Sequence, residues 1–259
     1  MNILFTICGR AGSKGVKNKN IKEFLGIPLV YYSLAAIKMC KDALPKDTIV
    51  DIALNTDSEA LVDLVKDQHL LDVDVLWREE SLGTDKVPKV AVIKDCYQRS
   101  SLKHNYEYDT VVDLDITSPL RTKEDVVNAI NTKISREDCD AVYSVTDSRR
   151  NPHFNMVKEE NGYFTKAVPS TFTTRQEAPE YFDMNASIYA YGIKALKEKP
   201  PVGFFNTNAY AIKMKDTAVL DIDSEEDFEL MEVIGKYLFE KYPDFAEIQK
   251  CAEAINKSV

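Results

Sequence analysis

NILFTICGRAGSKGVKNKN, residues 2–20, joins a short apolar run to a basic loop, and this junction decides the fold. The run has the β-branched and apolar character of a buried strand. Residues 8–20 then hold three glycines, one arginine and three lysines, with no acidic residue among them. The whole chain carries a formal net charge of -9. Positive charge gathered beside glycines after a first strand therefore indicates a local anionic ligand, for which a phosphate chain is the candidate.

Strand-like and helix-like segments alternate along the first half of the chain. The short β-branched runs that we interpret as strands are 2–8, 48–56, 72–77, 109–116 and 140–146. The segments with helical periodicity are 28–41, opened by Pro28, 57–68, capped by Asp57 or Ser58, 87–99, and 122–135, with a capping box of Thr122 and Asp125. This alternation predicts an α/β fold, with a mostly parallel sheet covered by helices on both faces. Ligands of such sheets bind beyond the carboxyl ends of the strands, where the basic loop lies.

The pattern changes after residue 146. Residues 147–180 hold several aromatic side chains but no long helical period, and Asn161-Gly162 is typical of a hairpin turn. Strands are then expected at 186–193, 207–214 and 217–222, followed by a helix at 224–242 and a final covering helix. No low-complexity linker or repeat separates these parts. We therefore expect one domain, residues 1–259, with 147–180 inserted as an extended excursion.

Composition disfavours several classes of protein. With 44% hydrophobic and 29% charged residues, the chain is typical of a soluble globular protein. Its acidic balance argues against a nucleic-acid or anionic membrane surface. The first apolar run is too short for a signal peptide, and no apolar stretch approaches the length of a membrane span. The five cysteines are scattered without Cys-x-x-Cys spacing, which favours reduced thiols in a cytoplasmic protein over a disulfide frame or a zinc site.

The basic loop matches neither common phosphate-binding motif. Its glycines stand three residues apart, which fits neither a Walker loop nor the Gly-x-Gly-x-x-Gly fingerprint. The underlying chemistry remains, because glycines let backbone N–H groups approach phosphate oxygens, while Arg10 and Lys14 offer charge-assisted hydrogen bonds. The alternative interpretation is a solvated basic turn.

Asp221 and Asp223 form a second candidate site. They are alternate residues of an expected strand, so both carboxylates would project to one face. Hard oxygen ligands at this separation suit Mg²⁺, which keeps several waters and bridges substrate phosphates. The alternative is that Asp223 or Ser224 caps the following helix, a role that can coexist with metal binding.

Five stretches together resemble a known family. They are CGRAGSKGVKNKNI from residue 8, DLDITSPLRTKEDV from 113, RRNPHFN from 149, TTRQEAPEYFDMNASIYAY from 173 and DIDSEEDFELME from 221. In this order they resemble the acylneuraminate cytidylyltransferases, the CMP-sialic acid synthetases, and most of all their legionaminic acid branch. The resemblance implies a three-layer, Rossmann-like nucleotidyltransferase fold and the reaction of CTP with a nonulosonic acid, an acidic nine-carbon sugar, giving CMP-sugar and pyrophosphate with Mg²⁺. It also implies a homodimer, in which 147–180 serves dimerisation and completes the neighbour's site.

The resemblance also implies roles for single residues. Arg10 and Lys14 would hold the triphosphate and stabilise its charge, Asp223 would help to deprotonate the attacking hydroxyl, and Asp221 and Asp223 would bind the metal. The nucleotide-binding set is Arg10, Gly12, Ser13, Lys14, Lys19, Asn20, Arg78, Thr84 and Asp85. The sugar-binding set is Asp115, Arg175, Gln176 and Asn185. The planar fork of Arg175 suits the sugar carboxylate. The remaining expectation is that the turn beneath the ligand is shaped by Ser118 and Arg121.

Asp115 stands where many sialic acid synthetases have glutamine. A carboxylate there would repel the anionic end of the sugar but could accept hydrogen bonds from hydroxyls or amides. This departure favours a relative of the ordinary sialic acid substrate. The stretches from residues 149 and 173 favour legionaminic acid, with N-acetylneuraminic and pseudaminic acid as alternatives and Kdo as a poorer fit. Two further alternatives come from other classes. The glycine spacing disfavours a P-loop ATPase, and the presence of Arg10, Lys14, Asp221 and Asp223 disfavours a noncatalytic nucleotide-binding module.

Overall fold

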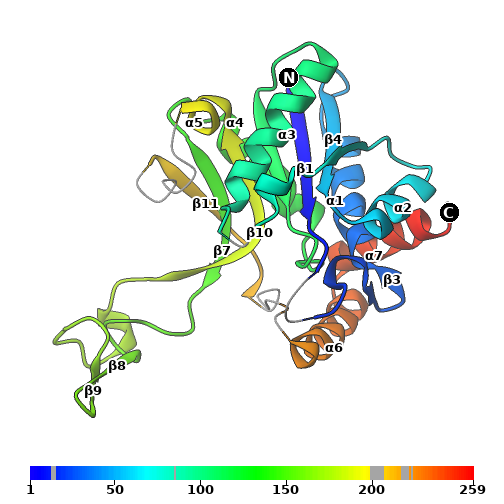
Figure 1. Cartoon of the computed structure of the whole chain (residues 1–259). Coiled ribbons are helices and arrows are strands. Elements are labelled where there is room, and N and C mark those ends of the chain that lie inside the picture. Colours follow the sequence, from blue (N-terminus) through cyan, green and yellow to red (C-terminus); the bar gives the residue numbers. More distant parts are fainter. Residues whose placement is uncertain (13–15, 85, 199–206, 217–221, 223) are drawn as a thin grey trace.

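The computed structural model describes residues 1–12, 16–84, 86–198, 207–216, 222 and 224–259. Its centre is a seven-stranded sheet in the order β11-β7-β10-β6-β1-β4-β5 (Figure 1). The strands are β1 (Asn2–Gly9), β4 (Ile49–Thr56), β5 (Asp74–Trp77), β6 (Thr110–Leu114), β7 (Ala141–Asp147), β10 (Phe182–Gly192) and β11 (Ala209–Lys213). Neighbouring strands run parallel except for β10, which is antiparallel to both β6 and β7. The mostly parallel sheet expected from the sequence is confirmed.

Helices cover the described part of this sheet. They are α1 (Leu29–Ala43), α2 (Glu59–Asp67), α3 (Lys89–His104), α4 (Lys123–Ile134), α5 (Ile193–Glu198), α6 (Glu225–Lys241) and α7 (Pro243–Asn256). The connections contain the 3₁₀ turns η1 (Lys19–Ile21), η2 (Glu80–Leu82) and η3 (Arg175–Glu177), and the short strands β2 (Glu23–Phe24) and β3 (Ile27–Pro28). None of the described helices has the length and apolar character needed to cross a bilayer.

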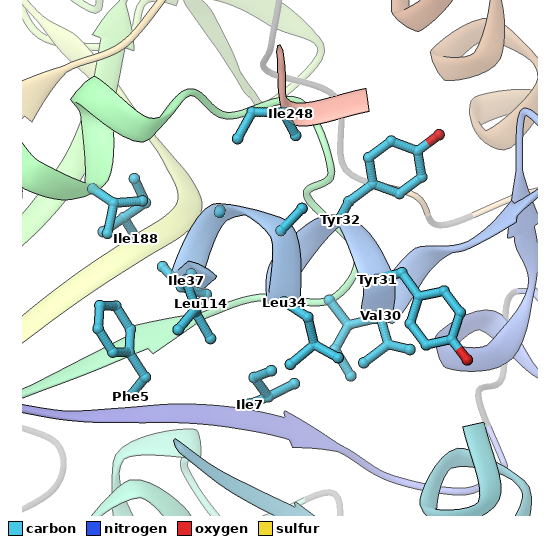
Figure 2. Packing of buried hydrophobic residues seen from close by; sticks show 14 of the residues in the cluster. Phe5, Ile7, Val30, Tyr31, Tyr32, Leu34, Ile37, Leu114, Ile188 and Ile248 are labelled. Carbon is cyan, nitrogen blue, oxygen red and sulfur yellow. The ribbon is translucent and has the colours of Figure 1, made fainter. Parts of the chain in front are cut away.

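Alternate residues of β1 pack into two cores, one on each face of the sheet. Ile3, Phe5 and Ile7 belong to a cluster that includes residues of α1, α4 and α7, whereas Leu4 belongs to a second cluster with α3. Figure 2 shows the first cluster, in which Phe5 and Ile7 face the apolar side of α1. Because successive side chains of a strand point to opposite faces, one buried strand can serve both cores. This arrangement gives the three layers expected for the fold.

Several helix starts follow local sequence signals. Ser58 caps α2, and Thr122 forms a capping box with Asp125 on α4. Ser224, one of the two residues proposed as the cap of α6, is the N-cap and forms a capping box with Asp227. These side chains accept hydrogen bonds from backbone N–H groups that a helix start leaves unpaired.

The structure also moves some expected boundaries. Helix α1 begins at Leu29, directly after Pro28. Helix α3 continues beyond residue 99 to His104 although its last turn is not apolar, and Asn105 ends it in the left-handed conformation. Strand β10 begins at Phe182 because its first residues pair with β7. The strand expected at 217–222 lies outside the described residues, except for Ile222.

Residues 148–181, which we call the arm, project away from the sheet between β7 and β10 (Figure 1). Their hairpin pairs β8 (Val157–Glu160) with β9 (Tyr163–Lys166). Asn161 and Gly162 both have positive φ, which confirms the predicted turn. The hairpin exposes three large apolar side chains to solvent, those of Val157, Tyr163 and Phe164.

Candidate functional site

The carboxyl ends of β1, β4, β5 and β6 gather at one edge of the sheet because these strands run parallel. The antiparallel β10 begins at the same edge, where Ile188 lies opposite Leu114 at the end of β6. In the sheet, β6 lies between β1 and β10. The fold therefore brings the basic loop after β1, the turn after β6 and the first half of β10 together.

Hydrogen bonds hold both flanks of the basic loop. Asn20 Nδ2 donates to the carbonyl oxygen of Arg10 at 2.9 Å, and the Ala11 N–H donates to Asp57 Oδ1 at 2.6 Å. Gly12, with φ of +75°, has the left-handed conformation that glycine adopts without strain. The loop is thus anchored before any ligand binds. Two other residues of this loop that were predicted to bind the nucleotide, Ser13 and Lys14, lie outside the described residues.

The loop after β1 meets the segment that precedes α6. The Lys19 ammonium group donates a hydrogen bond to the carbonyl oxygen of Ile222. Lys22 forms an ion pair with Glu225 in the first turn of α6. Ile222 itself is buried. Two parts of the chain about two hundred residues apart in sequence are therefore in direct contact at this edge.

Asp221 and Asp223, the expected metal ligands, lie outside the described residues. They flank Ile222, whose carbonyl oxygen contacts the basic loop. Two carboxylates on either side of such a residue are a donor set that fits a hard divalent cation. Within the described part of the chain, no group of three or more His, Cys, Asp or Glu side chains is placed to hold a metal ion.

A polar cavity of about 220 Å³ lies where these segments meet. Its lining residues are Lys19, Asp115, Thr117, Ser118, Asn185, Ala186 and Ile222. Lys19 was predicted to bind the nucleotide, and Asp115 and Asn185 to bind the sugar. The structure thus places predicted residues from both sets around one cavity.

The carboxylate of Asp115 is fixed from two sides. Its Oδ1 accepts hydrogen bonds from the backbone N–H of Thr117 at 2.9 Å and from the Thr117 hydroxyl at 2.8 Å. Its Oδ2 lies 2.8 Å from Nζ of Lys89. Burial raises the pKa of Asp115, but the Lys89 ammonium group and the Thr117 hydrogen bonds outweigh burial and hold this pKa well below its ordinary value. Asp115 therefore stays ionised in the cavity wall.

Lys89, the first residue of α3, is a site residue that the sequence reasoning missed. Its Nζ also lies 2.8 Å from Oδ2 of Asp113, which is fully buried and accepts a 2.7 Å hydrogen bond from the Thr6 hydroxyl. Desolvation lowers the pKa of Lys89, but Asp113 and Asp115 together raise it well above its ordinary value. A signal was present: two aspartates on one face at the end of a buried strand need a cation.

A bulge in β10 forms the opposite part of the cavity wall. The register of β10 with β7 shifts there, and Ala186 has a positive φ of 50°. This left-handed conformation costs an alanine of order 1 kcal/mol, so the surrounding contacts must hold it. Asn185 is buried; its Oδ1 accepts a hydrogen bond from the Ser144 hydroxyl, and its Nδ2 lies 3.2 Å from Sδ of Met214. These contacts fix the bulge, while a direct contact between Asn185 and the sugar stays a prediction.

Arg121 lies beneath the turn after β6, as expected. It is fully buried, and its guanidinium group donates to the carbonyl oxygens of Ser118 and Asp115, with Nε at 2.9 Å from that of Ser118. A cation that binds two carbonyls of one turn holds the turn in shape. The backbone that carries Asp115 and Ser118 into the cavity wall is thereby held in place.

The residues predicted for the cytosine side lie further along the same edge. Arg78 follows β5, and its Nε donates to Asn55 Oδ1 at 2.7 Å while its Nη2 donates to the Asn55 carbonyl at 3.0 Å. Thr84 is exposed in the turn before α3, and Asp85 lies outside the described residues. Arg78 and Thr84 share the sheet edge with the cavity but do not line it.

Arg175 and Gln176 lie on the arm, away from this cavity. They line a separate pocket of about 280 Å³ between the arm and the end of β7. Arg175 Nη2 donates to the carbonyl oxygen of Arg149 at 3.0 Å, and the side chain of Glu177 caps the turn that begins at Arg175. Within one chain, Arg175 and Gln176 therefore lie in a different pocket from Asp115 and Asn185, the other residues predicted to bind the sugar.

Comparisons with known proteins identify the family of this chain. The family described as cytidylyltransferase matches residues 4–242. The chain is 34% identical to post-translational flagellin modification protein B of Campylobacter coli, over 90% of this chain and 95% of that protein. It is also 34% identical to the CMP-N,N'-diacetyllegionaminic acid synthase of Campylobacter jejuni, over 90% of this chain and 94% of that protein.

The fold is shared with solved structures at much lower identity. A CMP:2-keto-3-deoxy-manno-octonic acid synthetase complexed with CTP superposes with a TM-score of 0.62 at 14% identity, covering 92% of this chain and 99% of that one. This likeness supports the three-layer nucleotidyltransferase fold, and the sequence matches extend it to the family. The chain therefore belongs to the cytidylyltransferase family and is a nucleotidyltransferase.

Proposed function

We propose that this cytidylyltransferase activates a nonulosonic acid, a derivative of legionaminic acid, by transferring CMP to it from CTP. The observation that carries the proposal is the contact between Lys19 and Ile222, because it joins the basic loop to the segment that holds the expected metal ligands. A triphosphate bound at that junction would meet cations from one side and carboxylates from the other. The legionaminic acid synthase of Campylobacter jejuni, among the relatives, supports this choice of sugar.

The reaction is a displacement at the α-phosphorus of CTP. The anomeric hydroxyl of the sugar forms a new O–P bond, the bond from the α-phosphorus to the pyrophosphate oxygen breaks, and the hydroxyl proton passes to Asp223. Charge grows on the phosphate oxygens, so positioning and electrostatic stabilisation dominate catalysis. Arg10, Lys14 and the backbone N–H groups of the anchored loop would supply that stabilisation.

The remaining residues would orient the two substrates. Mg²⁺, when bound by Asp221 and Asp223, would neutralise charge on the triphosphate. Lys19 would add a cation at the cavity rim, and Asp115 would face the sugar. Arg78 would lie on the side of the base, with Thr84 and Asp85 beside it.

A second copy of the chain would complete the sugar site. Three features support this: the arm exposes Tyr163 and Phe164 at 76% and 72%, it projects from the sheet (Figure 1), and Arg175 lies away from the cavity of its own chain. In a twofold dimer, the arm of each protomer would bring Arg175 and Gln176 to the cavity of its partner. The sugar carboxylate would then meet the guanidinium fork of Arg175.

The decisive assay is pyrophosphate release by the purified protein with CTP, Mg²⁺ and a panel of nonulosonic acids. We expect the highest kcat/KM with a legionaminic acid derivative and lower values with N-acetylneuraminic and pseudaminic acid. A preference for either of the latter two would reassign the sugar within the same reaction. No pyrophosphate release with any of these acids would contradict the proposed function.

A further inference from the structure

Lys89 bridges two carboxylates that differ in their surroundings. Asp113 is completely enclosed, whereas the side chain of Asp115 is 26% exposed and lines the cavity. Asp113 lies in β6 and Asp115 directly follows that strand, and both carboxylates contact Lys89 at the start of α3. One ammonium group at 2.8 Å from an oxygen of each leaves the trio with a net charge of one negative unit.

The hydrogen bonds of Asp115 leave little of its carboxylate free. An ionised carboxylate offers about four lone-pair sites, two on each oxygen. The two groups of Thr117 occupy the sites on Oδ1, and the ammonium group of Lys89 occupies one site on Oδ2. One acceptor site on Oδ2 remains for a ligand in the cavity.

We propose that Lys89 is a positioning residue for sugar recognition: it holds Asp115 so that one oxygen of the carboxylate accepts a hydrogen bond from a hydroxyl or amide N–H of the acidic sugar. This inference rests on the proposed function. The nearby guanidinium group of Arg121 offsets the net charge of the trio, but an acceptor oxygen of Asp115 still disfavours the sugar carboxylate at hydrogen-bonding distance. The free acceptor site on Asp115 thus selects a donor group at this position.

Lys89 fits a supporting role better than direct contact with the triphosphate. Its ammonium group is already shared between Asp113 and Asp115, whose attraction leaves it less able to bind another anion. Lys19, in contrast, lines the cavity itself. We therefore expect Lys89 to act on the sugar through Asp115 and to have little effect on CTP.

The test compares Lys89→Met, Asp115→Asn and the double variant, with Lys94→Met on the same helix as the matched control. In pyrophosphate release, each single variant should raise the KM for the sugar by roughly 10- to 100-fold, the effect of a hydrogen bond to a charged group, with the KM for CTP nearly unchanged. The double variant should be no worse than the poorer single variant, because both changes remove the same contact. Losses that multiply in the double variant, or an equal rise in both KM values, would overturn the proposal.

A second measurement needs no substrate and so separates this inference from the proposed function. Lys89→Met leaves two carboxylates without their cation, and should lower the Tm of the free protein by roughly 5 °C or more. Adding Asp115→Asn should recover part of that loss, because one of the unpaired charges is removed. Additive losses of Tm would show that Lys89 and Asp115 are not coupled and would refute the positioning role, whatever the enzyme's substrate.

Discussion

Lys19 and Ile222 are in direct contact, the ammonium group of the first donating to the carbonyl oxygen of the second. The hydrogen bond ties the loop after the first strand to the segment that carries Asp221 and Asp223. It also places a cation at the rim of the cavity that Asp115 and Asn185 line. A nucleotide site assembled in this way would depend on Lys19 both for its shape and for its charge.

Replacing Lys19 with methionine should therefore lower kcat/KM by roughly 10²-fold, since it removes a fixed cation from a site where negative charge develops. The measurement is steady-state pyrophosphate release with CTP varied. Lys17→Met is the matched control, because Lys17 is an exposed lysine of the same loop. If both variants lost activity equally, general loop charge rather than the contact with Ile222 would be responsible.

Asp221→Asn and Asp223→Asn should each abolish most of the turnover, because a neutral amide is a poor ligand for Mg²⁺. We expect chelation of divalent ions to stop the wild-type reaction and added Mg²⁺ to restore it, with the variants requiring much more metal. The exposed Asp47→Asn serves as the control for a simple change of net charge. Full activity of the wild type in excess chelator would exclude the metal site.

Mixed dimers test whether the arm acts on a partner. Arg10→Ala removes a cation of the cavity side, and Arg175→Ala removes the expected clamp on the arm, so each variant alone should be nearly inactive. When the two are co-expressed, random pairing should restore roughly a quarter of the wild-type activity, since half the dimers would contain one intact site. Arg10→Ala mixed with Lys19→Met should restore none. A monomer in sedimentation at micromolar concentration, or no recovery in dimers shown to be mixed, would contradict the shared site.

Alkaline pH should destabilise the protein through two tyrosines, Tyr106 and Tyr108, that precede β6 at the end of the sheet opposite the cavity. Tyr108 donates to Asp51 Oδ2 at 2.7 Å and Tyr106 donates to the same oxygen. Burial and this carboxylate raise the pKa of Tyr106 to about 12, whereas an unfolded tyrosine titrates near about 10. Between these values the unfolded state binds fewer protons than the folded state, so the free energy of unfolding should fall as pH rises.

Urea unfolding at a series of pH values measures this slope. The double variant Tyr106→Phe/Tyr108→Phe cannot ionise at either position, so it should lose less stability than the wild type across the same alkaline range. An identical slope in the double variant would assign the alkaline loss to other groups.

Local signals in the sequence were sufficient for much of the fold. Ser58, Thr122 and Ser224 each mark a helix start because a cap satisfies backbone groups within one turn of itself. The loop after β1 was identifiable from its glycines and cations alone. The boundaries of α3 and β10 were less predictable, because Asn105 and the pairing with β7 determine them rather than an apolar period.

The candidate site was only partly predictable for a different reason. Lys89 is one lysine among many in the sequence, and its role depends on a strand that lies elsewhere in the chain. Arg175 was chosen for its chemistry, but nothing in a single sequence fixes which cavity it serves. Tertiary contacts supply that information, and for the arm they would come from a second molecule.

Strand β10 connects the arm directly to the bulge in the cavity wall. The chain leaves the arm at Phe182, which pairs with Asp147, and reaches the bulge at Asn185 within three residues. Three paired residues of β10 therefore separate the base of the arm from the left-handed backbone of Ala186. If a second copy binds the arm as proposed, substitutions at that contact should also change which sugars the enzyme accepts.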